Sequence, residues 1–159
     1  MKHYRVVLKT SNLPYSREEI RNFATKYFNL DDEPKIVYNS SRNIDISLRL
    51  RYDSPSKRVI TRPCEIINDV ISLVRDMGIA WKYIEIMETE TFEGATGSAL
   101  AKEVGGSSVS DKDVGGAIVL AALGGLLGYM IGSKGEIVKK ILCVYQNKHG
   151  FPILVSSHE

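Results

Sequence analysis

The segment Val114–Gly132 most constrains what this chain can fold into, because its nineteen residues carry no charge. Two rows of small residues recur along it at every fourth position: Gly124, Gly128 and Gly132, and beside them Ala117, Ala121 and Gly125. On a helix, residues four apart lie on one face, and a face of small residues lets another backbone approach closely. No polar face is left for water. The segment must therefore be covered by a membrane, by other copies of the chain or by the protein's own core.

The stretch 124–135, GGLLGYMIGSKG, resembles the glycine-zipper segments of some outer-membrane lipoproteins and pore-forming proteins. The resemblance implies a homo-oligomer that associates along the glycine rows, and a membrane as one place where it assembles. Nineteen residues of helix reach about 28 Å, just enough for the hydrocarbon core of a bilayer. Those families usually pair two such segments, whereas this chain has one, so we expect self-association between chains. Packing of two short apolar pieces in a soluble oligomer is the alternative.

The first ninety residues read as alternating strands and helices. Ser16 and Glu19 form the capping box of a helix, and Ile44–Tyr52 alternates between apolar and polar residues as a half-buried strand does. A second helix follows Pro63 and ends at Gly78. Strands at His3–Thr10, Lys35–Tyr38 and Ala80–Met87 complete the set.

This order over residues 3–88 is β-α-β-β-α-β and resembles the ferredoxin-like arrangement. We therefore predict an α+β fold with a ferredoxin-like domain at 1–92. A Gly/Ser-rich linker is expected at 93–113, and the glycine-zipper segment with a C-terminal hairpin at 114–159.

Basic and aromatic residues share strand faces in the predicted sheet. Arg49 and Arg51 have the same parity on one strand, Arg5 lies on the first, and Tyr83 on the last. If these faces coincide, they suit a nucleotide or nucleic acid through stacking and charge. Cross-strand ion pairs, such as Arg49 or Arg51 with Glu85, are the simpler interpretation, and a net charge of +2 favours it.

A second anion candidate lies after the apolar segment. The run 131–141 resembles the G-x-x-G loop and following helix of K-homology RNA-binding domains. The resemblance implies a phosphate clamp between Gly132 and Gly135, with Lys134 facing the phosphate. A simple helix break between two glycines is the alternative.

Nothing in the sequence assembles a catalytic site. The three histidines lie near the termini or a turn, with no nucleophile or metal-ligand spacing beside them. Cys64 and Cys143 form no cluster and are expected to be free, buried thiols of a reducing compartment. We therefore predict a non-enzymatic, self-assembling protein that uses no cofactor or metal. We expect it in the cytoplasm, and membrane association stays open. A soluble oligomer that binds a nucleotide or nucleic acid is the alternative.

Overall fold

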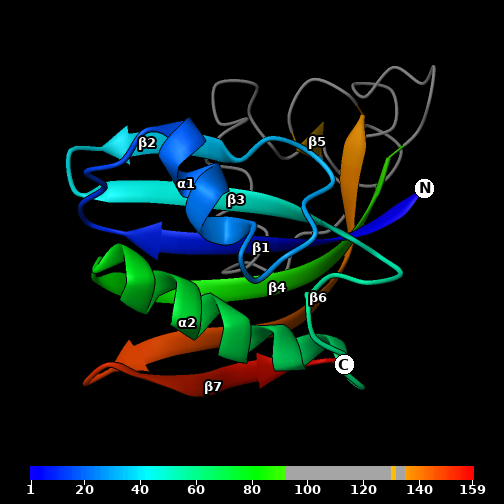
Figure 1. Cartoon of the computed structure of the whole chain (residues 1–159). Helices are drawn as coiled ribbons and strands as arrows, with labels where there is room; N and C mark the ends of the chain where they lie inside the picture. The colour runs from blue at the N-terminus through cyan, green and yellow to red at the C-terminus, as the bar shows by residue number, and fades with distance from the viewer. Residues whose placement is uncertain (92–129, 132–134) are drawn as a thin grey trace.

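A computed structural model describes residues 1–91, 130–131 and 135–159 (Figure 1). The elements in chain order are β1 Lys2–Thr10, α1 Arg17–Ala24, β2 Lys35–Ser40, β3 Asn43–Arg51, the 3-10 turn η1 Pro63–Glu65, α2 Ile66–Met77, β4 Trp81–Thr91, β5 Met130–Ile131, β6 Glu136–Lys148 and β7 Phe151–Ser157. All strand pairs are antiparallel and form one seven-stranded sheet in the order β2-β3-β1-β4-β6-β5, with β7 paired to β6.

The predicted ferredoxin-like α+β fold class is wrong. Strand β4 does not end the sheet, because β6 pairs with it from Tyr83 to Thr91 and β7 extends the sheet further. The part of the chain that the structure describes is mainly β, with two short helices of eight and twelve residues. Pairing between β4 and β6 joins segments on opposite sides of the stretch 92–135, and no local pattern in the sequence reports such pairing.

The two helices form where local signals place them. The Ser16 hydroxyl accepts a hydrogen bond from the Glu19 amide while the Glu19 carboxylate accepts one from the Ser16 amide, so the capping box is confirmed. Helix α2 ends at Gly78, whose φ of 64° lies in the left-handed region that favours glycine. Both helices lie on one face of the sheet (Figure 1).

The hydrophobic core fills the space between the helices and that face. Alternate residues of the central strands point into it, as the alternation along Ile44–Leu50 predicts. The buried side chains from β1, β3 and β4 are Val6, Leu8, Ile46, Leu48, Leu50, Ile84 and Ile86. The residues between them face the opposite side of the sheet, where the charged residues considered below lie.

The prediction of free cysteines is also wrong, because a disulfide joins Cys64 in η1 to Cys143 in β6. Both residues are buried. Such bonds are typical of oxidising compartments, so the predicted cytoplasmic location remains a prediction that needs its own test. Within residues 1–91, 130–131 and 135–159, no helix combines the length and apolarity needed to cross a bilayer.

Candidate functional site

The connection between β4 and β6 begins and ends at one point of the sheet. Its residues Met130 and Ile131, which fall in the segment read as helical, form the short strand β5 and pair with Ile137 and Glu136. Thr91, the last residue of β4, is the register partner of Glu136, the first residue of β6. The N-terminus closes the same corner, because the Met1 amine donates to the Thr91 carbonyl at 2.9 Å and the Thr91 amide donates to the Met1 carbonyl at 2.9 Å. In Figure 1 these three chain segments meet at the same end of the sheet. The long connection that contains Val114–Gly132 is therefore anchored at both ends in one place.

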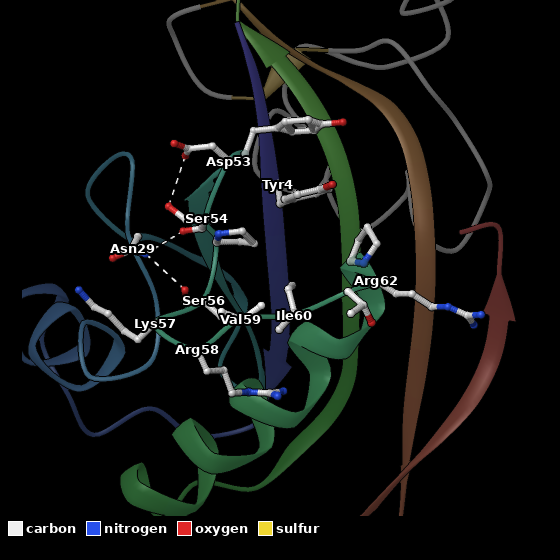
Figure 2. Close-up of a pocket in the computed structure, with 14 residues that line it drawn as sticks. Tyr4, Asn29, Asp53, Ser54, Ser56, Lys57, Arg58, Val59, Ile60 and Arg62 are labelled. Carbon is white, nitrogen blue, oxygen red and sulfur yellow. Dashed lines mark hydrogen bonds between the residues drawn. The ribbon is translucent and has the colours of Figure 1, made fainter.

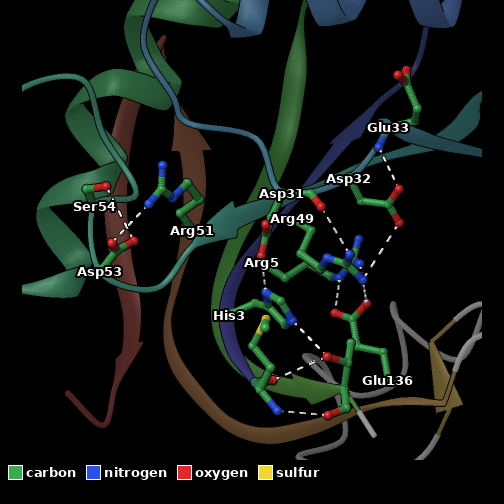
Figure 3. A network of polar contacts seen from close by, with 12 residues as sticks. His3, Arg5, Asp31, Asp32, Glu33, Arg49, Arg51, Asp53, Ser54 and Glu136 are labelled. Carbon is green, nitrogen blue, oxygen red and sulfur yellow. Dashed lines mark hydrogen bonds and ion pairs between the residues drawn. The ribbon is translucent and has the colours of Figure 1, made fainter. Parts of the chain in front are cut away.

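A buried ion pair lies at this anchor point (Figure 3). The Arg5 guanidinium donates from Nε to Oε2 of Glu136 at 2.7 Å and from Nη2 to Oε1 at 2.5 Å, and both side chains are 1% exposed. Its Nη1 also donates to the Ser47 hydroxyl at 2.6 Å. Two parallel N–H···O bonds between charged groups are the strongest form of this contact. The pair therefore ties β1 to the first residue of β6.

Arg49 adds a second cation to the same carboxylate. Its Nη1 lies 3.4 Å from Glu136 Oε1 and 3.7 Å from the Asp32 carboxylate, and its Nη2 donates to the Asp31 carbonyl at 3.1 Å. Burial alone would raise the pKa of the Glu136 carboxyl, but the hydrogen bonds and charge of Arg5, helped by Arg49, outweigh it and hold that pKa below its usual value.

His3 completes the cluster. Its Nδ1 faces the Asp31 carboxylate and its Nε2 lies 2.9 Å from the Thr91 hydroxyl. Burial, followed by the charge of Arg49, lowers the pKa of the His3 imidazole despite the Asp31 carboxylate. His3 therefore connects β1 to Asp31 and to β4, and these contacts fit a structural role at the anchor.

A second buried carboxyl lies on this face, and no salt bridge to it forms within the part of the chain that the structure describes. Glu85 is 0% exposed, and among the described residues neither of its oxygens has a hydrogen-bond partner. Burial raises the pKa of the Glu85 carboxyl well above its usual value, Lys9 opposes that shift, and Asp45 adds to it. The predicted pairing of Glu85 with Arg49 or Arg51 does not form, because Arg49 contacts Glu136 and Arg51 contacts Asp53 at 3.1 Å.

Glu85→Gln should stabilise the protein at neutral and alkaline pH. A carboxyl whose pKa is raised by folding favours the folded state at low pH and disfavours it as pH rises above the unfolded value of about 4.3. The stability gain of the variant should therefore be near zero below pH 4 and grow by about 1.4 kcal/mol per pH unit above it, up to the pKa of the folded protein. Urea unfolding at several pH values measures this, with Glu90→Gln, a partly exposed carboxyl of the same strand, as control. Parallel pH curves for Glu85→Gln and wild type would contradict the prediction.

A pocket of about 370 Å³ opens along the loop 53–63, between β3 and η1 (Figure 2). Asn29 holds the loop by donating to the Ser54 carbonyl at 2.7 Å. The rings of Tyr4 and Tyr52 stack on its wall with centroids 4.7 Å apart, and Lys2 lies 5.6 Å above the Tyr52 ring.

Basic side chains of the loop border the same pocket. Arg58 is paired with Asp69 at 3.0 Å, whereas Lys57 and Arg62, both exposed, make no salt bridge within the described residues. The pocket thus has an aromatic wall and, within the described residues, two cations without a salt bridge, whose side chains extend in opposite directions in Figure 2.

The predicted anion-binding residues are distributed differently from the expected single surface. Arg5 and Arg49 are register partners, but they converge on a carboxylate in the interior. Tyr83 lies farther along the sheet, where Lys9 Nζ is 5.7 Å from its ring centroid. The remaining predicted residues lie outside the described residues: Lys134 and the small-residue set Ala117, Ala121, Gly124, Gly125, Gly128 and Gly132.

Sequence reasoning missed Glu136 and the aromatic wall of the loop pocket, although it gives Lys57, Arg58 and Arg62 as a basic addition to the predicted sheet face. Glu136 lies shortly after the glycine-rich segment, but nothing in the sequence pairs it with Arg5. Across the described parts of the chain, no group of three His, Cys, Asp or Glu side chains is arranged to hold a metal ion. No family model, no curated protein and no solved structure matches this chain.

Proposed function

We propose that this protein is a non-enzymatic, self-assembling protein in which a rigid sheet presents the charge-free segment 114–132 to other copies of the chain. The observation that carries the proposal is the pairing of Thr91 with Glu136, which fixes both ends of the glycine-rich connection at one point of the sheet. The buried pair of Arg5 and Glu136 supports it, because two desolvated, hydrogen-bonded charges make the anchor point specific and stiff.

The same anchoring favours association between chains over a single membrane crossing. A single crossing would separate the two ends of 114–132 by roughly 28 Å, on opposite sides of a bilayer. The chain would then have to cross back through 93–113, which carries six charged residues. Charges within a bilayer are costly, by about 2.5–3.5 kcal/mol each at its centre. Other copies of the segment can cover its apolar surface while both of its ends stay at the anchor point, and no charged residue then has to enter a bilayer.

Gly128→Leu should break the glycine-row contact and lower the mass of the assembly while the sheet stays folded, because a leucine side chain prevents close approach along that row. Sedimentation velocity measures the particle mass, and the fluorescence of Trp81, the single tryptophan and a buried one, reports the fold. Gly115→Leu adds the same side chain to the same segment outside the glycine row and serves as control. Assembly of Gly128→Leu at wild-type mass, or an equal loss in the control, would contradict the proposed contact line.

The loop pocket favours a second candidate function, binding of a nucleotide or a single-stranded nucleic acid. Stacking on Tyr4 or Tyr52 and charge from Lys57 and Arg62 are the chemistry that such ligands need. In this candidate function the anion binds at the exposed loop. The predicted sheet face is not available for it, because Arg5 and Arg49 already contact the Glu136 carboxylate. Affinity that falls with rising salt is its signature.

A further inference from the structure

Strand β7 exposes an unusual amount of apolar surface at an edge of the sheet. Its side chains Phe151, Ile153, Leu154 and Val155 are between 47% and 64% exposed. They make up half of the large hydrophobic side chains that are exposed in the described residues. None of the seven residues of β7 is charged. An exposed, apolar and uncharged edge strand is a template for pairing with another strand.

The apolar side chains lie on both faces of β7, and this indicates how the surface is covered. Leu154 is the register partner of Tyr145, which packs against the helix-side core, so Leu154 lies on that face. Ile153 is the partner of Gln146 and lies on the other face. A partner that docks on one face would leave the other in water, whereas an added strand covers both.

We propose that β7 pairs in antiparallel fashion with β7 of a second copy, so that two sheets join edge to edge around a two-fold axis. An uncharged strand meets its own copy without like-charge repulsion, and an isologous contact closes after two chains because each β7 is then used. Pro152 has no N–H to donate, so the pairing segment is Ile153–Ser157. This interface is separate from the glycine row, and it adds a second contact to the proposed self-assembly.

Cysteine cross-linking tests the two-fold pairing directly. The native cysteines are joined to each other, so a single introduced cysteine is the free thiol of the chain. We introduce one cysteine at a time, as Ile153→Cys, Leu154→Cys or Val155→Cys, into the full chain that carries Gly128→Leu. Each variant is then oxidised, and the fraction of cross-linked dimer is measured on non-reducing gels. We expect at least about tenfold more dimer at the position nearest the axis than with Val59→Cys, a control that is 93% exposed.

A charge on β7 should separate the copies. In the same Gly128→Leu background, Leu154→Lys should weaken dimerisation at least tenfold in sedimentation equilibrium, while Val59→Lys leaves it unchanged. A monomeric Gly128→Leu chain, cross-linking at the Val59→Cys level throughout, or an unchanged dimer in Leu154→Lys would each overturn the β7 interface. None of these outcomes contradicts the contact along the glycine row, because that contact is tested separately by comparing Gly128→Leu with the wild type.

Discussion

Replacing Glu136 by alanine should lower the free energy of unfolding by about 3–5 kcal/mol, among the largest effects of any single substitution in this protein. The variant leaves the Arg5 guanidinium buried, with its Nε and Nη2 donors unmatched. An uncompensated buried charge costs far more than the net contribution of the pair, since forming the pair already required both groups to lose their hydration. Urea unfolding followed by Trp81 fluorescence measures the loss.

The exposed pair of Arg21 and Glu33 provides the matched control. Its two side chains are 41% and 53% exposed and their contact distance is 2.9 Å. Solvent screening limits such a pair to about 0–1 kcal/mol, so Glu33→Ala should barely change stability. The double replacement Arg5→Met with Glu136→Leu should recover most of the loss, because an apolar pair of similar volume removes the unmatched charge. Equal losses for Glu136→Ala and Glu33→Ala would show that the buried pair is not formed.

The two buried carboxyls of the sheet give opposite contributions to the pH dependence of stability. The pKa of Glu136 is lowered by folding, so its contribution is present above the unfolded value of about 4.3 and is lost as pH falls through the folded pKa. The pKa of Glu85 is raised, so it destabilises the folded state as pH rises above the same value. Wild-type stability should therefore peak at mildly acidic pH, and Glu85→Gln should move that maximum toward higher pH.

The parts of the fold that could be predicted are those set by neighbouring residues. The capping box of Ser16 and Glu19, the start of a second helical segment at Pro63 and its end at Gly78 are local signals, and the structure has all three. The alternation of Ile44–Leu50 likewise identifies the face that packs on the core. Such signals act within a few residues, so the glycine-rich stretch farther along the chain does not disturb them.

The parts that could not be predicted depend on contacts across the stretch 92–135. Strand parity correctly groups Arg5 with Arg49, which are register partners, but their counter-charge comes from Glu136, 131 residues from Arg5 along the chain. The ferredoxin-like interpretation failed for the same reason, because an element order that stops at β4 contains no information on the strand that pairs beside it. Strand parity also suggested an open basic face, whereas the low net charge favoured cross-strand ion pairs; the fold places Arg5 and Arg49 against an interior carboxylate.

The disulfide should contribute about 2–5 kcal/mol to stability. It closes a loop between residues separated by 79 positions, and the chain-entropy model gives about 4.5 kcal/mol for a loop of that length. It also joins η1, at the border of the loop pocket, to β6, which starts at the anchor point. We therefore expect thiol reductant to lower the urea midpoint of the wild type strongly.

The double variant Cys64→Ala with Cys143→Ala distinguishes the contribution of the disulfide to stability from that of the packing of the two sulfur atoms. Its stability should be close to that of the reduced wild type, and reductant should not change it further. Mass spectrometry of protein unfolded in the presence of an alkylating reagent and without reductant gives the oxidation state independently, because both cysteines are buried in the folded protein. Two alkylated thiols in the native protein, with a urea midpoint insensitive to reductant, would contradict the bond and support the reducing, cytoplasmic location that the cysteine spacing predicts. A strong response to reductant would instead mean that the bond between η1 and β6 contributes its stability only where the surroundings are oxidising.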